Sequence, residues 1–513
     1  MIKKSLRLTL ISAICFSLFL LSSSCFLFSK NDSDQNANTK RETDFDLPKS
    51  DLDLAKPIEF SQSPKDVALC KQMNQRIDES ESKNARWGVI AISLNDGRAV
   101  CGIDAQKSFN PASIQKLLTS IVALDKLGAG FRSKTSVFLD GELADETLKG
   151  NLILYGRGAP ELDSEGLAKL ISQLKQKGIK NITGDIIGDQ SHFNGDTLGD
   201  GWTWNEAQWY YGARASALTI NENKVTVTLQ NGKPKADSNL VDLSGEVKPI
   251  EDIEAIGLKR ELGTNKIYVW GNGKNLKARV AVSKPALLAA KIFEEQLEKN
   301  GIAVAGDAKT RDWKSTEKVD FEKAKEVASI EGKTLGEIVQ KMNKDSVNLY
   351  AELILRMLGK KFGDDAPDDN PKMQKLRGDD SAGASVIKKW LTDKDIATNE
   401  IAIHDGSGLS RLDLVTPEVF ARALIYASTA DFSETFKTSL PISGRSGTLK
   451  GRLGNVSGKV VAKTGTITYA NSLAGFAKSQ TETFAFAVIC NNETRKANSH
   501  LVIDQIVTLL ANY

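Results

Sequence analysis

Residues Phe109–Leu118, FNPASIQKLL, contain a serine, a lysine three positions later and the start of an apolar helical pattern. Asn110-Pro111-Ala112 lead into this pattern, and we expect the helix to stop at Gly128. Positions i and i+3 of a helix are neighbours on one face, so Ser113 and Lys116 lie side by side. A lysine held neutral at that distance can accept the hydroxyl proton, which makes Ser113 a candidate nucleophile.

Two further motifs follow in the chain, Ser346-Val347-Asn348 and Lys463-Thr464-Gly465-Thr466. In the first motif, alternate residues of a turn point the same way, so a hydroxyl can relay a proton to a departing amine while an amide holds Lys116. In the second motif, a strand offers a positive charge and hydroxyls to a carboxylate. Gly465 lets a substrate approach the backbone closely. Together the motifs predict acyl transfer by a serine.

Lys116 can serve as the base only if its pKa falls well below the value of about 10.4 for a free lysine. Burial and a second cation both disfavour the charged form, and Lys463 is the candidate cation. The oxyanion hole is expected to consist of the backbone N–H groups of Ser113, at a helix N-terminus, and of Thr466.

Each motif also has a purely structural interpretation. Ser113 can cap its helix, and Ser346 can cap the helix that Val347 begins. Lys116 and Lys463 can be surface charges, and Asn348 a solvated loop amide. The order of the three motifs favours the catalytic interpretation, since this triplet, with Ser-Asp-Asn in the middle, is typical of class A β-lactamases and penicillin-binding proteins.

From about Leu69 to its end, the chain resembles the D-alanyl-D-alanine carboxypeptidase/endopeptidases of the penicillin-binding protein 4 type, the low-molecular-mass class C. Besides the triplet, the resemblance rests on several runs: Asn110-Pro111-Ala112-Ser113, Gly150-Asn151-Leu152, Gly201-Trp202-Thr203-Trp204, Tyr211-Gly212-Ala213, Met342–Asn348 with Ala351-Glu352, Asp405–Arg411 and Gly447-Thr448-Leu449. The long insert between the first two motifs is itself a trait of that family.

The fold implied by the resemblance is α/β (α+β): a penicillin-binding, β-lactamase-like transpeptidase domain, in which helices and a helical subdomain flank an antiparallel sheet. Two smaller domains are inserted into it. We expect the catalytic domain to comprise residues 61–135 and 307–513, with the N-terminal hairpin completing the C-terminal sheet. An inserted α/β domain is expected at 136–224 and 271–306, and a nested β-rich domain at 225–270, where apolar and polar residues alternate.

The resemblance also implies roles for individual residues. Ser113 is the acylated nucleophile and Lys116 the base; Ser346, Asn348 and Lys463 complete the catalytic set. Thr464, Gly465 and Thr466 bind the substrate carboxylate, and Arg411 recognises the free end of a peptide side chain. In family members an acidic residue follows Trp202 by three positions, but this chain has Asn205 there and Glu206 beside it.

The first residues predict export. Lys3, Lys4 and Arg7 precede an apolar run that ends near Ser22-Ser23-Ser24-Cys25, as in a signal peptide. We expect residues 1–25 to be a signal peptide of lipoprotein type, with lipidation at Cys25 as a membrane anchor. Plain cleavage and an uncleaved anchor are the alternatives. Residues 26–60 are expected to form a flexible linker, and the protein to reside in the periplasm or cell envelope.

Composition and cysteines set further limits. The 513 residues predict two or three domains, and the net charge of +3 gives no argument for a nucleic-acid partner. Cys70 and Cys101 can pair in an oxidising compartment, and Cys490 fits a buried strand. The three histidines are isolated, so no metal site is expected. The sequence also lacks a Gly-x-x-x-x-Gly-Lys-Ser/Thr run for phosphate, and no cofactor is expected.

The sequence is therefore interpreted as a serine-type D-Ala-D-Ala carboxypeptidase/endopeptidase that acts on peptidoglycan stem peptides through an acyl-enzyme. β-Lactams are expected to acylate Ser113 and inhibit the enzyme covalently. Two alternatives remain: a β-lactamase or esterase on the same scaffold, and an inactive scaffold that binds the cell wall.

Overall fold

The computed structural model describes residues 45–48, 52–230, 233–244, 255–271, 273–317, 319–321, 324–365, 378–396, 400–494 and 498–513. Residues 45–513 form one compact unit. The predicted signal peptide, Cys25 and residues 26–44 and 49–51 of the predicted linker lie outside the described residues. Within the described ranges, no helix combines the length and the apolar character needed to cross a membrane.

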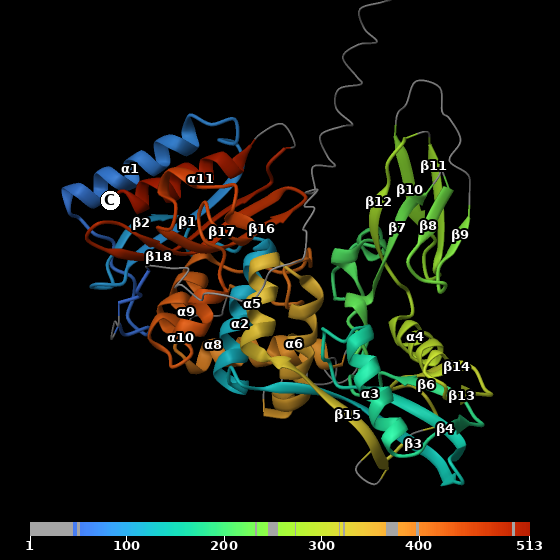
Figure 1. Cartoon of the computed structure of the whole chain (residues 1–513). Helices are drawn as coiled ribbons and strands as arrows, with labels where there is room; N and C mark the ends of the chain where they lie inside the picture. The colour runs from blue at the N-terminus through green and yellow to red at the C-terminus, as the bar shows by residue number, and fades with distance from the viewer. Residues whose placement is uncertain are drawn as a thin grey trace, which may run out of the picture. The chain divides into compact units, whose positions relative to one another are not determined.

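A five-stranded antiparallel sheet joins the two ends of this unit (Figure 1). Its order is β16-β17-β18-β1-β2, with bounds Val460–Ile467, Ala470–Lys478, Thr483–Asn491, Arg86–Ser93 and Ala99–Ile103. Strand β1 pairs with β18 along its whole length, from Arg86 opposite Asn491 to Ser93 opposite Phe484. The N-terminal hairpin therefore completes the C-terminal sheet, as predicted.

Helices cover both faces of this sheet (Figure 1). Helices α1 (Pro64–Asp78) and α11 (Ser499–Ala511) share one apolar core with it. The core on the other face includes residues of α2 (Gln115–Leu127), α5 (Leu335–Asp345), α6 (Asn348–Phe362), α8 (Asp379–Asp393), α9 (Pro417–Thr429) and α10 (Ser433–Ser439). This arrangement confirms the predicted penicillin-binding, β-lactamase-like α/β fold.

Local sequence signals place the ends of these helices. Gly128, at φ +80°, ends α2 in a conformation that favours glycine. Thr334 and Glu337 form a capping box at the start of α5, because each side chain accepts a hydrogen bond from the other residue's backbone N–H. Thr416 caps α9, which begins with Pro417.

The middle of the chain contains a mixed seven-stranded sheet with its own apolar core. Its strands are β3 (Arg132–Ala144), β4 (Thr147–Gly156), β5 (Asn181–Ile182), β6 (Ile186–Asp189), β13 (Ala303–Val304), β14 (Ala308–Arg311) and β15 (Lys325–Thr334). Helices α3 (Ser164–Gln176) and α4 (Pro285–Lys299) share the core. Strands β5 and β6 are separated by a short segment in which Gly184 lies against the Gly150 backbone.

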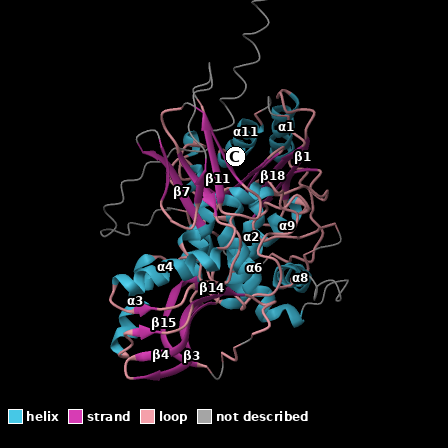
Figure 2. Cartoon of the chain, turned by 90° about the vertical axis from the view of Figure 1, so that its right-hand side faces the viewer, coloured by secondary structure: helices cyan, strands magenta, loops and turns pink. Residues whose placement is uncertain are grey.

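Two three-stranded sheets follow within residues 224–281 (Figure 2). One contains β7 (Lys224–Gln230), β8 (Lys233–Ala236) and β12 (Lys277–Ala281); the other contains β9 (Asp242–Ser244), β10 (Ile256–Arg260) and β11 (Lys266–Gly271). The division into three domains stays a prediction. Strands β14 and β15 follow residue 306, in the stretch assigned to the catalytic domain, but they pair with β6 and β3 of the seven-stranded sheet.

A disulfide joins Cys70 of α1 to Cys101 of β2, so the structure contains the pairing that the sequence left open. Cys490 is a free, buried cysteine on β18, in agreement with its expected place in a core strand.

Candidate active site

Ser113 lies in a single 3₁₀ turn, Ala112–Ile114, that leads directly into α2. Neither this turn nor α2 has a side-chain hydrogen bond at its N-cap, and the N-cap residue of α2 is Ile114. Ser113 therefore does not cap the helix. Its half-buried hydroxyl faces Lys116.

Lys116 is completely buried and has three hydrogen-bond partners. Its Nζ lies 3.0 Å from Ser113 Oγ, 2.6 Å from Asn348 Oδ1 and 2.6 Å from the Ser407 carbonyl oxygen. The first distance is the contact that the i, i+3 spacing predicts. The other two partners come from distant segments and hold the amine against the Ser113 hydroxyl.

The second motif lies between two helices. Ser346 ends α5 in the left-handed region, at φ +57°, and Asn348 is the first residue of α6. Ser346 Oγ does not cap α6 but accepts a hydrogen bond from Lys463 Nζ at 2.8 Å. Asn348 uses both ends of its amide, since Oδ1 contacts Lys116 and Nδ2 donates to the Tyr211 carbonyl at 2.9 Å. Asn348 therefore links Lys116 to the insert.

Strand β16 carries the third motif. Lys463 is fully buried and its Nζ also donates to the Thr464 carbonyl at 2.8 Å, while the hydroxyls of Thr464 and Thr448 lie 2.8 Å apart. A side chain at Gly465 would meet Ser472 Oγ at 2.2 Å and the Ser113 backbone nitrogen at 2.9 Å. The strand thus passes directly beside the predicted oxyanion N–H of Ser113, and glycine is required for this approach.

The two lysines occupy an unusual electrostatic environment. Burial lowers the pKa of Lys116 to about 7, against the opposing charges of Asp405, Glu352 and Asp413. Burial lowers the pKa of Lys463 well below its usual range, and the positive charge of Lys116 lowers it further. A base poised near neutrality is what proton abstraction from a serine requires. Neither lysine is the exposed surface charge of the structural interpretation.

Arg411 lies beyond the end of β16. Its guanidinium donates to the Thr468 carbonyl at 2.7 Å and pairs with Glu206 at 3.3 Å. Glu206, next to the unexpected Asn205, therefore supplies an acidic group beside Arg411. Thr466, the last carboxylate-binding candidate, is exposed on β16.

Sequence reasoning assigned no role to the loop and acidic groups behind Lys116. The Asp405 carboxylate accepts hydrogen bonds from the backbone N–H groups of Ser407, Gly408, Leu409 and Ser410 and from the Trp202 indole. These hydrogen bonds and one from Asp413 outweigh burial and lower the pKa of Asp405, whereas burial and Asp405 raise the pKa of Asp413. Asp405 and Glu352 lie in motifs that carry the family resemblance. Those motifs did not indicate what the two carboxylates do.

No group of three or more histidine, cysteine or acidic side chains in the described part of the chain could hold a metal ion. The arrangement instead offers a hydroxyl that can act as a nucleophile and a buried amine that can act as a base. It also offers a second hydroxyl that accepts a hydrogen bond from a buried lysine, and a strand beside a backbone N–H donor. These are the components of acyl transfer to serine.

Comparison with known proteins agrees with this chemistry. Residues 69–513 match the model of the D-Ala-D-Ala carboxypeptidase 3 (S13) family. A D-alanyl-D-alanine carboxypeptidase of an Actinomadura species is 27% identical over 494 residues, which are 91% of this chain and 89% of that protein. The D-alanyl-D-alanine carboxypeptidase DacB of Haemophilus influenzae is 27% identical over 408 residues, 76% of this chain and 81% of that protein.

A solved structure is similar over most of the chain. The crystal structure of penicillin binding protein 4 from Haemophilus influenzae superimposes with a TM-score of 0.74 at 26% sequence identity. The match covers 86% of this chain and 99% of that one.

Proposed function

The chain belongs to the D-Ala-D-Ala carboxypeptidase 3 (S13) family of serine peptidases, and we propose that Ser113 is the residue that forms its acyl-enzyme. One observation carries this assignment: a fully buried amine, Lys116 Nζ, lies 3.0 Å from Ser113 Oγ and is held by Asn348 and the Ser407 carbonyl. The substrate class is the peptidoglycan stem peptide, and β-lactams are covalent inhibitors.

In the proposed reaction, Thr464, Thr466 and Lys463 bind the terminal carboxylate of the stem peptide. Lys116 accepts the hydroxyl proton as Ser113 Oγ attacks the penultimate D-alanine carbonyl. The backbone N–H groups of Ser113 and Thr466 stabilise the oxyanion. The proton reaches the departing amine through Ser346, whose hydroxyl lies 2.8 Å from Lys463 Nζ. Water then hydrolyses the ester bond and releases the shortened peptide.

Labelling with fluorescent penicillin tests the nucleophile. We expect peptide mapping to place the label on Ser113, and the Ser113→Ala variant to remain unlabelled. Ser108→Ala is the matched control, because this nearby serine bonds only the Glu400 carbonyl among the described contacts. Labelling that persists in Ser113→Ala would contradict the assignment.

Product analysis separates the activities. Release of D-alanine from a pentapeptide establishes carboxypeptidase action, and cleavage of a cross-linked dimer establishes the endopeptidase action that we also propose. Rapid turnover of the antibiotic would instead indicate a β-lactamase. Arg411 is proposed to recognise the free end of the peptide side chain, with Glu206 beside it. Arg411→Ala should then raise KM for the stem peptide more than it lowers kcat.

We also propose that the protein is a lipoprotein of the periplasm or cell envelope, exported by residues 1–25 and anchored through Cys25. The basic start, the apolar run and the polar stretch up to Lys49 support this proposal. Metabolic labelling with a fatty acid should mark the wild type and Cys15→Ser but not Cys25→Ser. Equal labelling of both variants would contradict an anchor at Cys25.

A further inference from the structure

The Ser407 carbonyl that contacts Lys116 belongs to the loop Asp405–Ser410, and this loop is held by hydrogen bonds to two helices. The Gly406 N–H donates to Glu352 Oε1 at 2.9 Å, and the Gly406 carbonyl accepts from Thr119 Oγ1 at 2.7 Å. A side chain at Gly406 would lie 2.7 Å from the Ala351 carbonyl, so the loop rests directly on α6. The next carbonyl, that of Ser407, accepts from Lys116.

We propose that Glu352 is a positioning residue for the base Lys116: its carboxylate fixes the Gly406 peptide so that the Ser407 carbonyl faces the Lys116 amine. This inference rests on the proposed function of Ser113 and Lys116. Helix α6 then orients the base twice, directly through Asn348 and, four residues later on the same face, through Glu352.

The Glu352 carboxylate is itself held in a fixed orientation. Its Oε2 accepts from Arg356 at 2.8 Å, which leaves Oε1 for Gly406. Both side chains are almost completely buried. Arg356 also donates to the Asp196 carbonyl at 2.9 Å and lies 3.6 Å from Asp380. A continuous series of hydrogen bonds, joined through the backbone of the Asp405–Ser410 loop, thus runs from the insert to the amine of Lys116.

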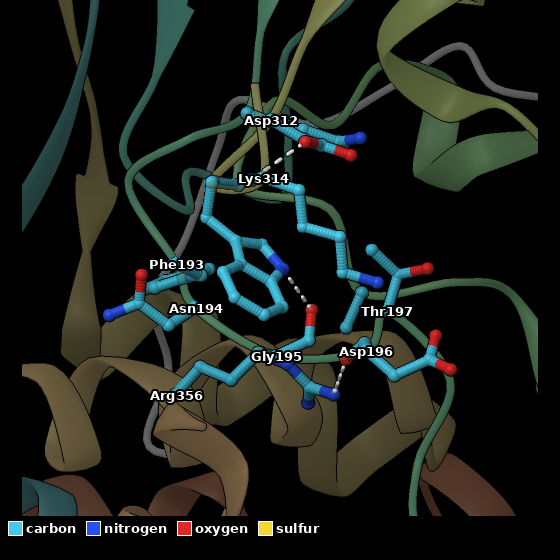
Figure 3. Close-up of a pocket in the computed structure, with 12 residues that line it drawn as sticks. Phe193, Asn194, Gly195, Asp196, Thr197, Asp312, Lys314 and Arg356 are labelled. Carbon is cyan, nitrogen blue, oxygen red and sulfur yellow. Dashed lines mark hydrogen bonds between the residues drawn. The ribbon is translucent and has the colours of Figure 1, made fainter. Parts of the chain in front are cut away.

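Figure 3 shows the insert end of this set of bonds. There Arg356 reaches the Asp196 carbonyl at the wall of a pocket of about 150 Å³, lined also by the Phe193–Thr197 segment and Lys314. A buried ion pair is weak evidence for stability, because desolvation opposes the attraction of the two charges. A role in holding the loop accounts better for a fully buried glutamate at this position.

Four ionisable groups act on Lys116 or respond to its charge: Asp405, Asp413, Glu352 and Lys463. The carboxylates favour the charged amine, so removal of the Glu352 charge lowers the pKa of Lys116. Burial raises the pKa of Glu352 itself to about 7, and the Asp405 charge adds to this, while Arg356 and the Gly406 N–H oppose it. The two groups therefore titrate in the same range and are coupled.

Two substitutions separate the charge of Glu352 from its reach. Glu352→Asp keeps the charge but withdraws the carboxylate from Gly406. Glu352→Gln keeps an acceptor for Gly406 and removes the charge. The matched controls are Glu418→Asp and Glu418→Gln, since Glu418 and Arg422 form another i, i+4 pair at 2.8 Å, on α9. The readout is the rate of penicillin acylation at saturating penicillin, measured from pH 5.5 to 9. Each rate is divided by the final amount of labelled protein.

We expect Glu352→Asp to acylate about fivefold more slowly or worse, with less than a threefold change in the half-saturating penicillin concentration. Glu352→Gln should reach its plateau rate at a pH lower by about half a unit or more. Both Glu418 variants should match the wild type. Because unfolded molecules are not labelled, dividing by the final labelled amount keeps a loss of folded protein from lowering the measured rate.

The inference is overturned if both Glu352 variants match the Glu418 variants in rate and in pH profile, whatever their yield or thermal stability. A wild-type protein that is not acylated at all would contradict the proposed function instead. The two failures are therefore distinguishable.

Discussion

Lys116 illustrates at the residue scale how position changes the chemistry of a side chain. Exposed on a helix it would be a cation at every physiological pH. Here burial lowers its pKa to about 7, while three nearby carboxylates limit that fall. The result is an amine that holds a proton in mildly acidic solution and accepts one above neutrality. Ser113, 3.0 Å away, is the group that can supply that proton.

Acylation should therefore depend on pH through Lys116. The neutral amine is the active form, so the rate should reach a plateau above pH 7 and fall toward tenfold per unit below it. Stopped-flow measurement with fluorescent penicillin from pH 5.5 to 9 checks this expectation. A rate that is constant across that range would contradict the assignment of Lys116 as the base.

At the scale of elements, the site depends on how closely strand β16 approaches the turn that carries Ser113. Gly465 makes this approach possible, since a Cβ there would lie 2.9 Å from both the Ser113 nitrogen and the Pro111 carbonyl. The Ser472 hydroxyl, on the neighbouring strand, also bonds the Pro111 carbonyl at 2.6 Å. Helix α6 also contributes to the site, because its first residue, Asn348, accepts a hydrogen bond from Lys116.

Gly465→Ala should therefore reduce acylation about tenfold or more, because even a small shift of β16 displaces the proposed oxyanion donors. Gly451→Ala is the matched control, since a Cβ at Gly451 meets no atom within 4 Å. Acylation rates at saturating penicillin measure both effects. Equal rates for the two variants would show that β16 does not need this close approach.

At the scale of the whole molecule, residues from both ends of the compact unit are joined beside α1. Asp66 accepts hydrogen bonds from Ser61, from Arg98 and from the C-terminal residue Tyr513. Burial would raise the pKa of Asp66, but these hydrogen bonds outweigh it and lower the pKa. The Cys70–Cys101 disulfide joins the same helix to β2.

Asp66→Asn should lower the free energy of unfolding at pH 7 by about 2 kcal/mol, through loss of hydrogen bonds to a charged group. Because the folded pKa is lowered, this contribution is present above the unfolded value of about 3.9 and is lost as pH falls through the folded pKa. Urea unfolding should thus show a difference between wild type and variant that closes in acid. Asp78→Asn, at the exposed end of α1, should show no such difference.

Removal of the disulfide should lower the free energy of unfolding by about 2–4 kcal/mol, since it closes a loop with a sequence separation of 31. The double substitution Cys70→Ala and Cys101→Ala tests this in urea, monitored by tryptophan fluorescence. Reducing agent should destabilise the wild type to a similar extent and leave the double variant unchanged. A reductant effect on the double variant would point to another cause.

Much of the fold could be predicted from sequence because its signals are local. The Ser113–Lys116 spacing, the Gly128 stop and the apolar run Phe484–Cys490 each depend on neighbouring residues, and the structure contains the corresponding helix and strand. Strand β15, by contrast, had no such signal. Its burial alternates irregularly, and it is a strand because it pairs with β3, about 190 residues earlier.

The sequence by itself determined the candidate nucleophile, its neighbouring lysine and the order of the three motifs, because helix periodicity and strand alternation follow from local spacing. Only the tertiary structure decided that Lys116 can act as a base. Its burial, the Asn348 amide 232 residues away and the Ser407 carbonyl 291 residues away come from segments that meet only in the folded chain. A pKa reflects what surrounds a group in space, and no local spacing contains that information.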